Sequence, residues 1–261
     1  MLAPLLARAQ APRTTGRIGE YTPPKVWPQR ARTFDLLHQR IAVSYDLDKR
    51  SVAGEVETRL IVTAAPTDTI RLDASQLTID AATDAKGAKL RFSFDTSSVT
   101  VHLAKRAKIG DTVVFSLRYH GLPERGMYFV PRRRVMWTQG EAIETPSWVP
   151  TYNAPNDKTT WEILVTADTG VSVLSNGRLV EVTNASGGAK KIWHWSQELP
   201  ASTYMYSIVA AKFSILRDSW RGIPVEYWVA SDTVNAGWRT FGETPSMIEI
   251  YSQTLGVNFP W

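Results

Sequence analysis

The sequence predicts an all-β protein, a saddle-like sandwich of antiparallel strands, with a short α-helical segment at the C-terminus. Apolar and polar residues alternate in many short runs, which is the period of a strand with one buried face. Turn-forming residues separate these runs at short intervals, as they do in antiparallel sandwiches. A helical pattern of apolar residues appears only after Ser231.

Regular structure is expected to begin near Thr33 with a hairpin. Every second residue is apolar in residues 41–47, and residues 56–62 repeat this alternation. The segment DKRSVAG between the two runs supplies turn residues. We therefore expect the two runs to pair as neighbouring antiparallel strands.

The same alternation predicts further strands along the next part of the chain. They are expected at residues 69–72, 77–81, 89–94, 98–103, 112–119, 127–130, 135–137, 160–167, 178–182, 190–197, 206–216 and 224–229. No helical pattern interrupts this series. Residues 33–231 are therefore predicted to form one all-β domain.

The C-terminal segment, residues 232–261, has a different pattern. Thr244 suits the N-cap of a helix, Pro245 its first position, and Gly256 its end. Between them the apolar residues form a helical stripe of Met247, Ile250, Tyr251 and Leu255. We expect this segment to be the start of a second, helical domain that is cut off at the end of the sequence.

The first residues, 1–32, are predicted to be a leader. Residues 12–32 are rich in Pro and Arg and show no hydrophobic period. Residues 1–11, MLAPLLARAQA, resemble the end of a secretory signal with its small-residue cleavage site. They are either the remnant of such a signal or an ordinary leader. The small residues favour the first interpretation, and with it export to a periplasm or to the outside of the cell.

Composition and charge exclude several classes of function. The net charge of +5 is spread along the chain, and the one dense basic cluster, residues 132–134, belongs to no nucleic-acid-binding motif. No apolar run is long enough to cross a membrane as a helix. The absence of cysteine excludes disulfides, thiolate metal sites and a cysteine nucleophile. We therefore expect neither a nucleic-acid partner nor a membrane span.

No complete catalytic or metal-binding set is visible in the sequence. The four histidines, at positions 38, 102, 120 and 194, lack the spacing of metal ligands. The Gly-x-Ser-x-Gly turn of serine hydrolases and a phosphate-binding glycine loop are both absent. The ten tryptophans are predicted to lie mainly in the core, because large aromatic side chains dominate the interior of sandwiches.

Several short motifs follow one another in an order that points to a known family. They are YHG at residues 119–121, GMYF at 126–129, TQGE at 138–141, PTYNAPNDK at 150–158, LSNG at 174–177, ASTYMYSIVAAKF at 201–213, GIPV at 222–225 and GVNFPW at 256–261. Together they resemble the M1 family of zinc aminopeptidases, from about Tyr45 to the end of the chain. The resemblance implies a saddle-shaped N-terminal β domain that stacks on a thermolysin-like zinc domain.

The chemistry of that family requires a His-Glu-x-x-His motif, which occurs nowhere in this sequence. We therefore expect no catalytic and no metal-binding residue in this chain, and no cofactor bound by it. The resemblance implies zinc for the full-length parent, bound by the missing catalytic domain, and a peptide N-terminus as the substrate.

The resemblance assigns substrate binding to Gln139, Gly140 and Glu141. In the family, a Gln and a Glu at the first and last of these positions lie near the substrate's free α-amino group. An α-ammonium carries three donors and a positive charge, so an amide oxygen and a carboxylate are suitable partners. On an extended segment Gln139 and Glu141 face the same way, and Gly140 lets backbone or substrate approach closely.

Two positions differ from the family pattern. Many relatives have an Arg where this chain has Pro146, and an Asp where it has Asn153. Both changes are expected to affect how the loop is held rather than the contact with the ammonium group.

Two other functions are compatible with the sequence. The chain could be a protein-binding scaffold that keeps the β domain without the chemistry, which the changes at Pro146 and Asn153 favour. It could also be a carbohydrate-binding sandwich that uses exposed tryptophans, with Trp193 and Trp195 as the candidates.

Overall fold

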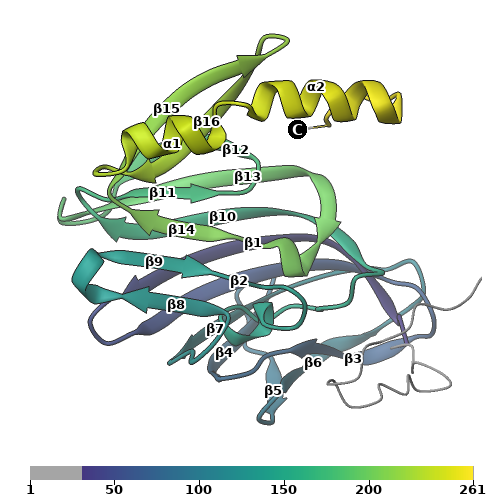
Figure 1. Cartoon of the computed structure of the whole chain (residues 1–261). Helices are drawn as coiled ribbons and strands as arrows, with labels where there is room; N and C mark the ends of the chain where they lie inside the picture. Colours follow the sequence, from purple (N-terminus) through teal and green to yellow (C-terminus); the bar gives the residue numbers. More distant parts are fainter. Residues whose placement is uncertain (1–30, 261) are drawn as a thin grey trace, which may run out of the picture. The chain divides into compact units, whose positions relative to one another are not determined.

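The largest element of the fold is a seven-stranded sheet, shown in Figure 1 in a computed structural model that describes residues 31–260. Its strands lie in the order β12, β13, β10, β1, β2, β7, β4. Their bounds are β1 Phe34–Asp46, β2 Ser51–Val62, β4 Leu77–Asp84, β7 Thr112–Gly121, β10 Lys158–Asp168, β12 Arg178–Asn184 and β13 Lys190–Ser202. The predicted first hairpin, β1 with β2, is confirmed.

The seven-stranded sheet is not antiparallel throughout. β1 and β10 run parallel, with Ile41 opposite Ile163, whereas the other neighbouring strands are antiparallel. Two strands that pair in parallel need a long connection, and here the chain between them builds all the strands from β2 to β9. The alternation of residues within each strand could not indicate this direction.

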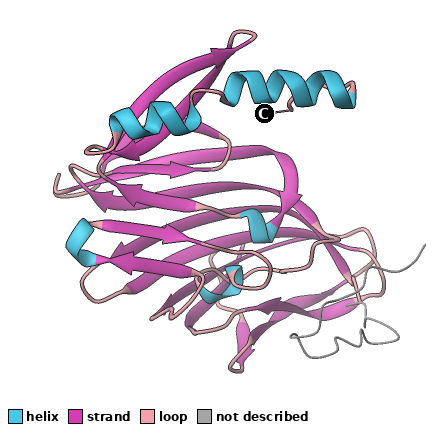
Figure 2. Cartoon of the chain, in the orientation of Figure 1, coloured by secondary structure: helices cyan, strands magenta, loops and turns pink. Residues whose placement is uncertain are grey.

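Two smaller sheets share a core with the large one. One has the strand order β3, β6, β5 and the other β11, β14, β9, β8 (Figures 1 and 2). Their bounds are β3 Thr67–Asp73, β5 Arg91–Phe94, β6 Ser98–Ala107, β8 Met127–Val130, β9 Val135–Thr138, β11 Ser172–Ser175 and β14 Ile208–Ala211. One continuous apolar cluster joins all three sheets, including Leu117 of β7, Val101 of β6 and Met136 of β9. Trp148 and Trp161 are fully buried, as predicted for most tryptophans.

The C-terminal part of the fold is a hairpin followed by two helices. β15 (Phe213–Trp220) pairs with β16 (Ile223–Ala230), and α1 (Val234–Phe241) and α2 (Thr244–Leu255) follow. A small second core of Leu216, Tyr227 and Val229 lies in the hairpin, with Val234 of α1 against it. The helix α1 was not predicted as a separate element.

The predicted strand at residues 206–216 was wrong in extent. The structure divides it into β14 and β15, which belong to different sheets. An apolar run that passes from one sheet to the next has the same period on both sides, so the pattern gave no boundary. The short strand β11 was also missed.

The predicted start of the C-terminal helix was wrong by one residue. Thr244 is the first residue of α2, and Glu243 precedes it without a side-chain cap. The Thr244 hydroxyl instead donates to the Phe241 carbonyl at 2.6 Å. Gly256 ends the helix in the left-handed conformation, as predicted.

A buried hydrogen-bond network connects the large sheet to the segment after β9. Gln39 of β1 donates from Nε2 to Thr58 Oγ1 at 2.9 Å and to the Pro150 carbonyl at 3.2 Å. Its Oε1 accepts from Thr151 Oγ1 at 2.6 Å and from Tyr206 Oη at 3.0 Å. The fully buried side-chain amide thereby uses its two donors and two acceptor positions, and two of the four hydrogen bonds hold residues 150–151.

No helix among residues 31–260 is long and apolar enough to cross a membrane. The predicted leader, residues 1–32, lies almost entirely outside the described residues, so that interpretation stays a prediction.

Candidate functional site

The candidate amine-binding residues lie on a loop at the end of β9. Gln139 and Glu141 are exposed, and Gly140 between them is buried. β9 ends at Thr138 and residues 141–144 form a turn, so the extended segment expected to carry both side chains ends before Glu141. Gln139 and Glu141 are therefore accessible to solvent, whereas Gly140 faces the interior.

Gly140 is required because the loop lies directly on two other segments. A Cβ atom at this position would lie 2.3 Å from Thr145 Oγ1 and 2.3 Å from the Tyr204 carbonyl oxygen. No side chain fits at such distances without a shift of the backbone. The close approach expected at Gly140 is therefore an approach of this chain's own backbone.

Glu144 holds the loop against the start of β8. Its Oε2 atom accepts two hydrogen bonds at 3.1 Å, one from the Gly126 amide and one from Tyr128 Oη. The backbone amide of Gln139 donates to the Gly126 carbonyl at 3.0 Å, and the backbone amide of Glu144 donates to the Gly140 carbonyl at 2.9 Å. Both ends of the loop are thus fixed to one point, Gly126. Sequence reasoning did not find Glu144, because its partners lie far from it along the chain.

The two positions that depart from the family pattern support the same loop. Asn153 Nδ2 donates to the Ala142 carbonyl at 3.0 Å, and its Oδ1 accepts from Thr203 Oγ1 at 3.1 Å. Pro146 is buried, and its carbonyl accepts from the Ser75 amide at 2.8 Å. Asn153 therefore connects the loop to Thr203, with its donor on the loop and its acceptor on Thr203, a combination that an ionised aspartate lacks.

The side chains of Gln139 and Glu141 are available for a ligand. Among the described residues, 31–260, none makes a hydrogen bond or an ion pair with either side chain. An exposed carboxylate and an amide oxygen two residues apart can accept hydrogen bonds from one ammonium group. The loop offers a binding function but no group that could attack a substrate.

A hollow of about 620 Å³ lies beside β8 and β9, and we call it the aromatic hollow. Residues from β8, β9, the β1–β2 turn and the segment after β7 line it, among them Lys49, Arg50, Leu122, Pro123, Tyr128 and Trp137. The rings of Tyr128 and Trp137 are stacked, with centroids 4.5 Å apart and planes 23° apart. Leu122 is 66% exposed and Trp137 37% exposed, so apolar surface faces solvent here. The sequence pattern did not predict this hollow, because four separate segments form it.

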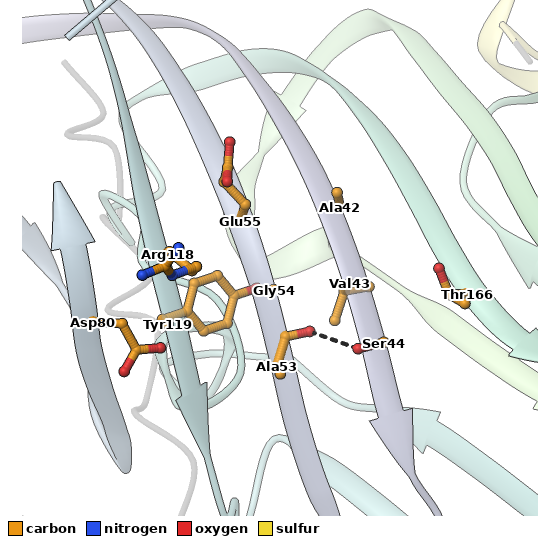
Figure 3. Close-up of a pocket in the computed structure, with 10 residues that line it drawn as sticks. All are labelled: Ala42, Val43, Ser44, Ala53, Gly54, Glu55, Asp80, Arg118, Tyr119 and Thr166. Carbon is orange, nitrogen blue, oxygen red and sulfur yellow. Dashed lines mark hydrogen bonds between the residues drawn. The ribbon is translucent and has the colours of Figure 1, made fainter. Parts of the chain in front are cut away.

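A second hollow, of about 330 Å³, lies along β1, β2 and β7 (Figure 3). Figure 3 shows the Tyr119 ring with its hydroxyl toward Gly54, where a Cβ atom would lie 2.8 Å from that hydroxyl. Two polar groups at its rim have partners: Ser44 Oγ donates to the Ala53 carbonyl, and Asp80 pairs with a histidine. The Tyr119 hydroxyl is buried and has no hydrogen-bond partner among residues 31–260. The lining includes no residue of the loop after β9, so we do not place the amine site there.

Three histidines pair with carboxylates that are distant in the sequence. His194 Nε2 lies 2.8 Å from Glu162, and His38 Nε2 lies 3.9 Å from the same carboxylate. His120 Nδ1 lies 2.9 Å from Asp80. Burial lowers the pKa of His38 although Glu162 acts in the opposite direction. Within residues 31–260 no group of three or more His, Cys, Asp or Glu is placed to bind a metal ion.

The two tryptophans considered for carbohydrate binding are not free platforms. Trp195 is 6% exposed and packs edge-on against Trp228, with ring centroids 6.4 Å apart. Trp193 is only partly buried but packs against the main core. The two rings contribute to packing, and nothing in their surroundings suggests a sugar site.

The fold agrees with what comparison with known proteins shows. Residues 36–205 match the family model described as "Peptidase M1 N-terminal domain". The chain belongs to the peptidase M1 N-terminal domain family. The aminopeptidase N of Acetobacter pasteurianus is 23% identical over 233 residues, which are 84% of this chain and 64% of that protein.

Solved M1 structures have the same fold. The M1 zinc metallopeptidase of Deinococcus radiodurans superposes with a TM-score of 0.71 at 20% identity, over 85% of this chain and 53% of that one. A two-domain M1 zinc metallopeptidase mutant bound to L-arginine gives a TM-score of 0.72, over 54% of its length. This chain therefore spans about half to two thirds of the length of these M1 relatives.

One similar protein has a name that is not that of a peptidase. The transcription initiation factor TFIID subunit 2 of Gallus gallus is 23% identical over 148 residues, which are 53% of this chain and 13% of that protein. The M1 N-terminal domain is thus similar to part of a protein from a different functional class.

Proposed function

We propose that this chain provides the N-terminal half of the substrate site of an M1 aminopeptidase, a loop that binds the free α-amino group of a peptide. One observation supports the proposal above all others. Gln139 and Glu141 lie exposed, and their side chains have no partner among residues 31–260, on a loop that hydrogen bonds hold to Gly126.

The loop suits an ammonium group for electrostatic reasons. Glu141 supplies a full negative charge and Gln139 a neutral acceptor, so two of the three ammonium donors have partners. The loop is fixed before the ligand arrives, by Glu144 from one side and Asn153 from the other. A preorganised loop loses less conformational entropy on binding than a loose one.

Hydrolysis itself is assigned to a second domain. The solved relatives are named zinc metallopeptidases, and this chain covers 53–54% of their length. The described residues offer no set of zinc ligands, so we derive no step of peptide cleavage from them. Several apolar side chains of α2 are exposed, namely Met247, Ile250, Tyr251 and Leu255. We infer that the rest of a catalytic domain packs on this face of α2.

The amine-binding role can be tested on this chain alone. We would titrate the ¹⁵N-labelled protein with leucinamide at about pH 6.5, where an α-amino group is protonated. The amide resonances of Gly140 and Glu141 should move. N-acetyl-leucinamide, which has no charge at that position, is the matched control and should leave them in place. Equal shifts with both compounds, or none with leucinamide, would refute the proposal.

The second candidate function is a protein-binding scaffold. The similarity to a TFIID subunit and the departures at Pro146 and Asn153 favour it. An assay of the protein encoded by the complete open reading frame distinguishes the two functions. Turnover of leucine p-nitroanilide that Glu141→Ala reduces supports the enzyme, whereas no turnover together with no leucinamide binding supports the scaffold.

A further inference from the structure

We propose that the hollow along β1, β2 and β7 binds a small zwitterion, such as a free amino acid, whose carboxylate contacts Arg118 and whose ammonium group contacts Glu55 (Figure 3). We call it the sheet hollow, because it lies on the large sheet. None of its lining residues belongs to the loop after β9, so the ligand occupies a second site that is independent of the proposed function.

Short side chains form the floor of the sheet hollow. Ser44 of β1 lies opposite Ala53 of β2, and Ala42 lies opposite Glu55. Residues directly opposite each other on antiparallel strands share one face of the sheet. Three short side chains therefore lie together where other positions of this face carry long ones, such as Arg40. The resulting volume of about 330 Å³ is in the range of sites for small molecules.

Two opposite charges without partners border this floor. Glu55 of β2 lies directly opposite Arg118 of β7, and both residues are exposed. Among residues 31–260 neither side chain makes a hydrogen bond or an ion pair. A guanidinium can hold a carboxylate through two parallel hydrogen bonds, and a carboxylate accepts from an ammonium group. An amino acid carries both of its charged groups on one carbon atom, so a single small ligand can contact both side chains.

The Tyr119 hydroxyl is a second, independent indication of a ligand. Tyr119 is 1% exposed, lines the sheet hollow, and directs its hydroxyl toward Gly54 (Figure 3). Within the described part of the chain this hydroxyl has no hydrogen-bond partner. Burial raises the pKa of Tyr119, so the hydroxyl remains a donor at neutral pH. A buried donor without an acceptor is unfavourable, and a ligand oxygen at Gly54 provides that acceptor once the floor yields slightly.

The test compares three ligands that differ in their charges. We would titrate the ¹⁵N-labelled chain at about pH 6.5 with leucine, leucinamide and N-acetyl-leucine, and follow the backbone amides of Gly54, Glu55 and Arg118. Leucine carries both charges, leucinamide only the ammonium group, and N-acetyl-leucine only the carboxylate. Leucine should bind roughly ten-fold or more tightly than the other two, because each of them lacks one charge-assisted contact.

Glu55→Gln and Arg118→Gln should each remove this preference for leucine. Glu57→Gln is the matched control, because Glu57 is exposed two residues further along β2 and does not line the sheet hollow. It should leave leucine binding unchanged. Equal affinities for the three ligands, or equal effects of Glu55→Gln and Glu57→Gln, overturn the inference. The Gly140 amide reports leucinamide binding at the loop after β9, so the proposed function is judged separately.

Tyr119→Phe distinguishes binding from folding. It should weaken leucine binding roughly three- to ten-fold, because one hydrogen bond to the ligand is lost. The free energy of unfolding in urea, without ligand, should stay the same or rise, because the change removes a buried hydroxyl that has no partner. Unchanged leucine binding, or a loss of stability as large as the loss of binding, overturns the inference.

Discussion

Replacing Gln39 by leucine tests whether the buried amide network stabilises the fold around the site. The change keeps a similar volume but removes all four hydrogen bonds, to Thr58, Pro150, Thr151 and Tyr206. Some of the hydroxyl groups can rebond to one another, which leaves about two buried polar groups without partners. Each such group costs roughly 1–3 kcal/mol, so we expect a loss of about 2–6 kcal/mol.

The assay is urea unfolding, followed by tryptophan fluorescence. Gln139→Leu is the matched control, because the same substitution at an exposed, unpaired glutamine should change the free energy of unfolding by less than about 0.5 kcal/mol. Two equal effects would refute the reasoning, as would a loss below about 1 kcal/mol for Gln39→Leu.

A double mutant gives a sharper criterion. Tyr206→Phe should cost about 1 kcal/mol in the normal background, because it removes one hydrogen bond to Gln39. In the Gln39→Leu background the same change removes a buried hydroxyl that has lost its partner, so it should be neutral or stabilising. Additive effects would show that Gln39 and Tyr206 act independently.

The remaining predictions concern the loop and a buried acid. In the complete enzyme, Glu141→Ala should raise KM and lower kcat/KM for peptides with a free amine, and unchanged kinetics would contradict the assigned contact. Gly140→Ala should abolish the leucinamide shifts and destabilise the chain by about 1–3 kcal/mol, measured by urea unfolding, because its Cβ overlaps Thr145. Burial raises the pKa of Asp157 to about 6, above its value in the unfolded chain. The free energy of unfolding should therefore fall as pH rises from about 4 through 6. Asp157→Asn should remove up to roughly 3 kcal/mol of this pH dependence, measured by unfolding titrations at several pH values.

The sequence was a good guide to strands and a poor guide to their partners. The alternation in β1 and β2 predicts a hairpin, and the turn between them fixes its direction, so both were found. Nothing in β1 alone indicates that β10 lies beside it in parallel, because that pairing depends on the path of all the chain between them. The division of residues 206–216 between two sheets was hidden for the same reason.

The candidate site divides in a similar way. Gln139, Gly140 and Glu141 form one short motif, so the sequence could indicate them. The groups that hold them, Glu144 and Gly126, become neighbours only when β8 pairs with β9. Short motifs can therefore predict candidate ligand contacts, whereas the residues that position them depend on tertiary structure.

Tyr128 connects the loop to the aromatic hollow through its hydroxyl and its ring. Its hydroxyl donates to the Glu144 carboxylate, which also accepts from the backbone amide of Gly126. The carbonyl of Gly126 accepts from the backbone amide of Gln139. Its ring forms the wall of the hollow with Trp137. A movement of this one side chain would displace both the ammonium partners and the aromatic surface. Asn153 donates to the Ala142 carbonyl of the same loop, and Pro146 follows Glu144 by two residues. The departures from the M1 pattern at these two positions therefore concern the support of the loop and not the exposed side chains of Gln139 and Glu141.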